Sequence, residues 1–415
     1  MRLCDQQRRG RPRLPRVPKR GGELRGRREE DRSTISTITA SRFAGLDGLR
    51  GLAAVIVVLY HTLLASTWGD AYQGALAEMP TSSATVNLIA NTPLRYLVMG
   101  PEAVVVFFAL SGFVLVLPML QGRALDLWSY YPRRVLRLWI PSVAAMLLAA
   151  VVILSTTQRP DDAPSAWGRA FSFASLSPGE IVDSLFLITG STKTNNPLWS
   201  LRWELLFSFM LPLAFLLVAR VRRGAWGWLI LCGVASGTGG LLGVQALTYG
   251  PMFLAGSLVA TMAVRDARAG LARPWILIAG GLLLIGTPDA LRVVTPFVLP
   301  DGIRGFSQGT VTVGAALLVL GLTRPSGATT LLSSRLFRFL GRISFSLYLV
   351  HVPLLIGAIH VAPFVPHRAL LVVLPIVAIV AVLFTRWVEE PSARLARRAG
   401  RAASTRVRAL VGQDR

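Results

Sequence analysis

The chain has 415 residues, of which 53% are hydrophobic and 16% are charged. Soluble proteins of this length rarely have such a composition, so we expect several spans of about 20 apolar residues. The net charge of +23 would suit a nucleic-acid partner. However, the basic residues cluster in the two tails and in loops between apolar runs, where such charges usually set membrane topology. We therefore expect membrane lipids, and no nucleic acid, among the partners.

Ten apolar segments predict an all-α fold, a polytopic membrane helix bundle of about ten transmembrane helices. Residues 1–41 are rich in Arg, Pro and Gly and contain no apolar signal-peptide core, so they predict a disordered basic tail. Residues 42–391 form the predicted integral-membrane domain, and residues 392–415 form a second basic tail. The spans are expected near residues 43–65, 99–120, 136–155, 199–219, 225–244, 248–264, 275–287, 306–323, 343–362 and 369–388.

The charges of the loops predict the orientation of the chain in the cell membrane. Four loops on one side, within 121–138, 219–225, 265–274 and 324–342, hold fourteen Lys and Arg against two acids. The loops on the other side hold seven against eight. The positive-inside rule therefore predicts that both termini are cytoplasmic.

The first predicted span carries ionisable residues on one helical stripe. Arg50 and His61 are eleven residues apart, which at about 100° and ~1.5 Å per residue places them within roughly 20° of each other and ~16 Å apart. Asp47 lies on nearly the same stripe and is expected to pair with Arg50. This arrangement places Arg50 near the headgroups and His61 near mid-membrane, where an ionisable group usually faces a cavity or a partner. The alternative is a buried hydrogen-bonded pair in a transporter-like bundle.

The fourth predicted span opens at the extracytoplasmic side with Trp199, Ser200 and Glu204. Ser200, Glu204 and Ser208 recur every fourth residue and share one face. A carboxylate at this position would orient a histidine, bind a hydroxyl group or pair with an arginine. The alternative is an interfacial tryptophan belt with Glu204 paired to Arg202 or a neighbour.

Two further segments contain candidate binding residues. Arg134 and Arg137 lie one turn apart where the third span begins on the cytoplasmic side, and arginine suits phosphate and pyrophosphate. The alternative is charge that only sets topology. Ser111 and Gly112 form a small pair within the second span, which predicts either close helix packing or a cavity for an acyl chain or a pantetheine arm.

The ninth span carries a second polar stripe, because Ser344, Tyr348 and His351 follow at i, i+4 and i+7. Two such stripes in one bundle favour a reactive cavity. The sequence Glu389-Glu390-Pro391 follows the tenth span and predicts a helix stop with surface acids. The two cysteines and four histidines show no ligand spacing, so we expect no metal site.

Taken together, these segments resemble the membrane acyltransferase-3 family, which includes O-antigen and peptidoglycan O-acetyltransferases and macrolide acyltransferases. The pieces follow the family's order over about residues 43–391 and are individually weak but specific as an ordered set. They are Leu46-Asp47-Gly48-Leu49-Arg50-Gly51 through Tyr60-His61, Phe108-Ala109-Leu110-Ser111-Gly112-Phe113, Arg134 with Arg137, Leu198-Trp199-Ser200-Leu201 with Glu204, Leu340-Gly341 through Ser346-Leu347-Tyr348-Leu349-Val350-His351 with Pro353, and Glu390-Pro391.

The chain also departs from the family pattern at three places. Phe207-Ser208 follows the glutamate where an aromatic pair is usual, and Ser344-Phe345 replaces a serine-tyrosine pair. Arg202 stands where a small residue is common. These departures affect the expected acceptor specificity more than the expected type of reaction.

The resemblance implies transfer of an acyl group, with acetyl expected, from cytoplasmic acyl-CoA to a hydroxyl group. The implied acceptor is a carbohydrate, a lipid-linked glycan or a glycosylated metabolite. Acyl-CoA would be a co-substrate, with no tightly bound cofactor. The alternative is a non-enzymatic transporter or flippase for a polar lipid or glycan.

The resemblance also suggests a role for each candidate residue. His61 would act as general base, with Glu204 as a second catalytic residue, and Glu204 or Tyr348 would orient His61 or the acceptor. The donor would be held by Arg50, Arg134, Arg137 and Ser111, and the acceptor by Trp199, Ser200, Tyr348 and His351.

Overall fold

The computed structural model describes residues 43–77, 79, 81–156, 163–171, 179, 182, 185–187, 195–221, 223–265, 273–294, 305–361 and 366–413. Contacts divide the chain into two units, Met1–Phe43 and Ala44–Arg415. The tail predicted for residues 1–41 lies outside the described residues. The fold is therefore that of the second unit.

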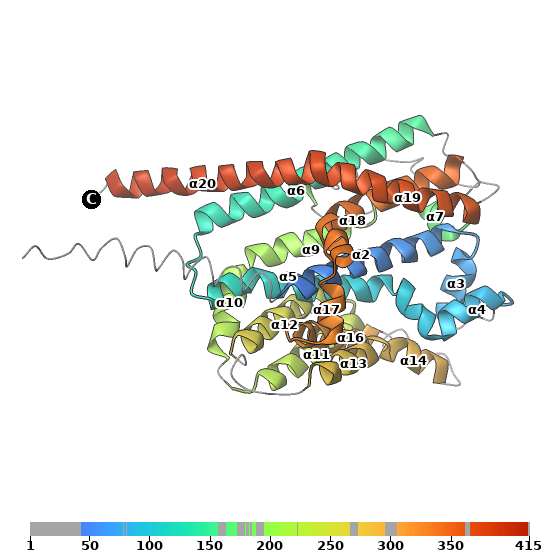
Figure 1. Ribbon diagram of the computed structural model, residues 1–415, viewed down its shortest axis with the longest axis horizontal. Helices are drawn as coiled ribbons and strands as arrows, with labels where there is room; N and C mark the ends of the chain where they lie inside the picture. Colours follow the sequence, from blue (N-terminus) through green and yellow to red (C-terminus); the bar gives the residue numbers. More distant parts are fainter. Residues whose placement is uncertain are drawn as a thin grey trace, which may run out of the picture. The chain divides into compact units, whose positions relative to one another are not determined.

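The described secondary structure of this unit is helical throughout, which confirms the predicted fold class (Figure 1). In chain order it comprises α2 (Ala44–Ala65), α3 (Gly69–Leu76), α4 (Ala84–Asn91), the 3-10 helix η1 (Pro93–Val98), α5 (Gly100–Leu120), α6 (Leu127–Ser155), α7 (Ala166–Ala170), α9 (Leu198–Phe209), α10 (Leu211–Arg220), α11 (Ala225–Leu242), α12 (Gln245–Arg265), α13 (Pro274–Ile285), α14 (Thr287–Val294), α16 (Gln308–Leu322), α17 (Gly327–Leu332), α18 (Arg335–Val361), α19 (Pro366–Phe384), a π-helical turn (Thr385–Glu389) and α20 (Glu390–Gln413).

Eight stretches of the described chain are long and apolar enough to cross a membrane, and the bent pair of α9 and α10 makes a ninth. The sequence predicted about ten spans. The difference is α16, an apolar helix of only 15 residues, whereas a span needs about 20. The eight stretches are Ala44–Ala65, Gly100–Leu120, Leu127–Ser155, Ala225–Leu242, Gln245–Arg265, Pro274–Arg292, Arg335–Val361 and Val372–Val411.

The fourth predicted span is broken rather than continuous. Helices α9 and α10 meet at Met210 with a bend of 64°. Pro212, in the first turn of α10, has no amide hydrogen to donate to the carbonyl four residues earlier, so the ladder is interrupted at this point. As a result α9 is a short helix, and its polar face points in a different direction from α10.

Helices α5 and α12 approach each other closely through glycines. A side chain at Gly112 would place its Cβ 1.9 Å from the carbonyl oxygen of Phe253, and one at Gly256 would place it 1.9 Å from that of Ala109. The hydroxyl of Ser257 donates a hydrogen bond of 3.2 Å to the Gly112 carbonyl. Gly112 therefore serves close packing of the kind seen at small-residue membrane interfaces.

Helices α2 and α18 form another close pair. A Cβ at Gly51 would lie 2.5 Å from the backbone nitrogen of Gly341, and one at Gly341 would lie 2.3 Å from the carbonyl oxygen of Asp47. Only glycine permits the two backbones to come this near. The two polar stripes found in the sequence, one on each helix, are thereby brought together.

The helix stop predicted at Glu389-Glu390-Pro391 is wrong. The chain passes from α19 through the π-helical turn directly into α20, which reaches Gln413. Pro391 is tolerated because it lies in the first turn of α20, after the π turn has shifted the hydrogen-bond register. Figure 1 shows α20 running beside α6, where the side chains of Ser404 and Arg408 bind Asp126.

Candidate functional site

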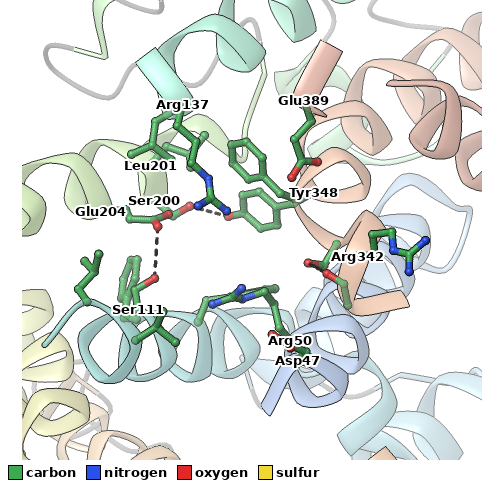
Figure 2. A pocket seen from close by; sticks show the side chains of 18 of the residues that line it. Asp47, Arg50, Ser111, Arg137, Ser200, Leu201, Glu204, Arg342, Tyr348 and Glu389 are labelled. Carbon is green, nitrogen blue, oxygen red and sulfur yellow. Dashed lines mark hydrogen bonds between the residues drawn. The ribbon is translucent and has the colours of Figure 1, made fainter. Parts of the chain in front are cut away.

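A cavity of about 480 Å³ lies between α2, α5, α6, α9, α18 and the π-helical turn (Figure 2). Its polar and aromatic lining includes five arginines, three carboxylates, three serines and a tyrosine. These residues are Arg50, Arg134, Arg137, Arg338, Arg342, Asp47, Glu204, Glu389, Ser111, Ser200, Ser344 and Tyr348. The cavity thus combines the candidate residues of five separate sequence segments.

Most of the cavity arginines contact no carboxylate among the residues that the structure describes. Arg134 forms an ion pair with Glu204. For Arg50, Arg137, Arg338 and Arg342, no carboxylate among the described residues lies within 4 Å of the guanidinium group. Cations without a contacting carboxylate in a partly enclosed site attract anions, and guanidinium groups suit phosphate in particular.

Arg338 and Arg342 are functional candidates that sequence reasoning missed. The loop charges place both residues in a basic loop, 324–342, that sets topology. Their i, i+4 spacing on α18 was the available signal, because it places both side chains on one helical face.

Glu204 lies beside Arg134 rather than beside a histidine. One of its carboxylate oxygens accepts hydrogen bonds from Arg134 and, at 3.3 Å, from the hydroxyl of Ser111. Arg134 also donates from Nε to the hydroxyl of Ser208 at 2.8 Å. The sequence placed Glu204 and Arg134 at opposite membrane faces. In the structure α9 is short and the chain bends after it, and Glu204 meets Arg134. The described contacts of Glu204 therefore hold Arg134 in position.

The expected Asp47–Arg50 ion pair is not among the described ion pairs, although both residues line the cavity. Trp199 does not line it. Its ring packs against Tyr249 and Phe108, with centroid separations of 5.3 and 6.1 Å. The structure therefore places Trp199 in an aromatic cluster between α5, α9 and α12.

His61 and His351 form a buried pair that joins the two polar stripes. Nε2 of His351 lies 3.2 Å from Nδ1 of His61, and both residues are buried. Nδ1 of His351 lies 3.1 Å from the carbonyl oxygen of Leu347, and Nδ1 of His61 lies 2.9 Å from that of Val57. Because a carbonyl only accepts, each Nδ1 carries the hydrogen, and Nε2 of His351 accepts from His61.

This tautomer leaves Nε2 of His61 unprotonated, with a lone pair that can accept a hydrogen bond. It lies 3.3 Å from the side-chain amide nitrogen of Asn196, which can donate to it. The ring of Trp167 in α7 lies 5.4 Å from that of His61. His61 is one turn from the end of α2 at Ala65, so it lies nearer the helix end than the mid-span position expected. Asn196 is a further residue that the sequence did not single out.

Tyr348 connects the cavity to the histidine pair. Its hydroxyl lies 2.7 Å from that of Ser200, and Ser200 donates to the carbonyl of Pro197 at 3.0 Å. Tyr348 must therefore be the donor in the Ser200 hydrogen bond. Its ring lies 6.0 Å from that of His351, and both Tyr348 and Ser200 line the cavity. His351, expected to contact substrate, is instead fully buried against His61, with ring centroids 5.1 Å apart, and neither histidine is among the residues that line the cavity.

Comparisons with known proteins identify the family of the chain. The family model described as an acyltransferase domain matches residues 43–386. Acyltransferase MdmB of Streptomyces mycarofaciens is 25% identical over 332 residues, which cover 75% of this chain and 78% of that protein. No solved structure matches the chain significantly. Because the matched region includes nearly the whole described bundle and both polar stripes, the chain belongs to the membrane acyltransferase-3 family.

Proposed function

We propose that this protein transfers an acyl group, with acetyl expected, from cytoplasmic acyl-CoA to a hydroxyl group of a carbohydrate, a lipid-linked glycan or a glycosylated metabolite. One observation carries the proposal. Four arginines that contact no carboxylate in the described part of the chain line a single cavity, and the wall of that cavity includes the tyrosine next to the histidine pair. The acyltransferase family and the name of the Streptomyces relative support acyl transfer as the reaction.

The donor would bind through its phosphate groups. Arg50, Arg137, Arg338 and Arg342 offer planar guanidinium groups that can each donate two parallel hydrogen bonds to a phosphate. CoA carries a diphosphate and a 3′-phosphate, so it supplies several anionic groups to a cavity of this charge. The pantetheine arm would then extend past Ser111 toward Tyr348, and the thioester would lie near the histidine pair.

His61 would act as the general base. Its unprotonated Nε2, once the acceptor hydroxyl replaces the Asn196 amide as its partner, would take the hydroxyl proton as the oxygen attacks the thioester carbonyl. A C–O bond forms, the C–S bond breaks, and the CoA thiolate leaves and takes the proton back from His61. During the attack His61 is an imidazolium, and Nε2 of His351 accepts the hydrogen bond from its Nδ1. His351 would thus orient His61 and stabilise its charged form.

The two substrates would reach the site from opposite membrane faces. The loop charges predict that the arginine-rich cavity faces the cytoplasm, where acyl-CoA is made. Nε2 of His61 lies at Asn196 and near Trp167, both in the segment predicted to be extracytoplasmic. Trp167 offers an aromatic face and Asn196 an amide beside the base, which suits a sugar ring with hydroxyl groups.

The reaction is testable with the purified protein and acetyl-CoA. Wild-type protein should release CoA thiol when given a panel of glycosides, and mass spectrometry should detect the acetylated glycoside. His61→Ala should reduce the rate to a few per cent, while His360→Ala, a histidine on α18 that bonds to Ile356, should keep it. A glycoside that crosses vesicle membranes without thiol release would show a transporter instead.

The donor site is testable by binding. Arg137→Ala should weaken CoA binding roughly 10- to 150-fold, since a hydrogen bond to a charged group contributes about 1.5–3 kcal/mol. Arg137→Lys should restore only part of the affinity, because an ammonium group lacks the bidentate fork. Arg133→Ala, about one turn earlier on α6 but outside the cavity lining, is the matched control. Unchanged CoA affinity in Arg137→Ala would contradict the donor assignment.

A further inference from the structure

We propose that Glu389 is an internal counter-charge of the arginine-rich cavity, which weakens the binding of polyanions there and so promotes release of the spent donor. The proposal deepens the proposed function and rests on it for the identity of the donor. In the sequence Glu389 belonged to a predicted helix stop with surface acids. The structure gives it a different position.

The π-helical turn aims Glu389 into the cavity. This turn, Thr385–Glu389, joins α19 to α20, and Glu389 lines the cavity while the next residue does not. One extra residue in a helical turn rotates the rest of the helix by about 100°, and such turns are frequent at functional sites. Glu390 is 53% exposed and is paired with Arg394 on α20 at 3.9 Å. The chain therefore separates two adjacent glutamates, with one inside the cavity and one outside.

A hydrogen bond holds the Glu389 carboxylate in place. Ser346 of α18 donates from its hydroxyl to one carboxylate oxygen at 2.6 Å, and Ser346 is fully buried. Figure 2 shows the Glu389 carboxylate projecting into the space that Arg137 and Arg50 also reach. The carboxylate is thus fixed from the α18 side, and its charge faces the cavity.

Glu389 acts on the cavity arginines through its charge but forms no ion pair with Arg137 or Arg50 within the described part of the chain. It interacts electrostatically with Arg137 and Arg50, yet among the described residues neither arginine lies within 4 Å of a carboxylate. Glu389 therefore offsets positive charge in the cavity without occupying the hydrogen-bond donors of these two guanidinium groups. A bound phosphate is attracted by the arginines and repelled by Glu389 across a partly desolvated space.

The test uses the full-length protein and two anions, CoA and inorganic pyrophosphate. Glu389→Gln removes the charge but keeps an oxygen that can accept from Ser346. We expect roughly ten-fold tighter binding of both anions in this variant, since partly buried charges interact at a low effective dielectric. Glu390→Gln is the matched control for the loss of one glutamate, and its affinities should equal those of the wild type. Ser346→Ala removes the hydrogen bond and keeps the charge, so binding should stay within about two-fold.

The outcomes separate this inference from the proposed function. Unchanged or weaker anion binding in Glu389→Gln, with a wild-type melting temperature, would overturn the counter-charge role, whatever the donor is. If CoA does not bind but pyrophosphate binds more tightly in Glu389→Gln than in the wild type, the inference stands and the proposed donor fails. Equal tightening in Glu390→Gln would also overturn it, because the effect would then be one of net charge alone. If neither anion binds to any variant, both proposals fail.

Discussion

Replacing Tyr348 by phenylalanine should slow acyl transfer while leaving the bundle folded. The variant loses only the hydroxyl that donates to Ser200 at 2.7 Å. The ring remains, so its edge-to-face packing on Phe107, with centroids 5.7 Å apart, is preserved. Its neighbour His351 also keeps its aromatic contact, with centroids 6.0 Å apart. The perturbation is therefore confined to one buried hydrogen bond.

The size of the rate loss in Tyr348→Phe depends on the hydrogen bonds that Ser200 retains. Its own hydroxyl hydrogen still bonds to the carbonyl of Pro197 at 3.0 Å, so only an acceptor site on its oxygen becomes unpaired. A loss of this kind costs about 1–2 kcal/mol, which corresponds to roughly a 5- to 30-fold change in rate. Because the hydroxyl is directed at Ser200 and not at an arginine, the effect should fall on kcat and leave CoA affinity nearly unchanged.

A double-mutant cycle separates this bond from general damage. Tyr348→Phe, Ser200→Ala and the double variant are compared by thiol release from acetyl-CoA and by melting temperature in detergent. If the bond acts as one unit, the double variant should be no slower than the slower single variant. Additive losses in rate, or a lowered melting temperature with an unchanged kcat, would refute the reasoning and leave Tyr348 as a packing residue.

Three further predictions test the histidine pair, the packing and the orientation. His351→Ala should lower kcat about 10- to 150-fold, because the base loses its charge-assisted partner. His351→Gln should recover part of the lost rate. A wild-type rate in His351→Ala would contradict the pairing. Gly256→Ala should cost about 1–3 kcal/mol of stability in thermal unfolding, since its Cβ would lie 1.9 Å from a backbone carbonyl oxygen of α5. The control is Gly250→Ala on the same helix. Its Cβ meets nothing within 4 Å, so this variant should be neutral or stabilising. In a background without native cysteines, a cysteine at Gln73 should react with an impermeant maleimide on intact cells and one at Gly327 should not; the reverse would overturn the predicted orientation.

The sequence by itself determined the fold class and the composition of each polar stripe. Apolar runs of about 20 residues predict membrane-spanning helices, because a helix pairs the backbone N–H and C=O groups of the run within the segment itself. Helical periodicity also assigns Arg50 and His61 to one face of α2, and Tyr348 and His351 to one face of α18. These relations are local, so they can be read from spacing alone.

Only the tertiary structure decided which stripes meet. Residues 290 positions apart form the His61–His351 pair, and Arg134 meets Glu204 although loop charges placed them on opposite sides. The break at Met210 and the π-helical turn before Glu390 change the helical register, which a regular 3.6-residue period cannot anticipate. Helix faces are brought into contact by close backbone approach, as at Gly51 and Gly341. That approach depends on the shapes of two distant segments at once, so local spacing does not encode it.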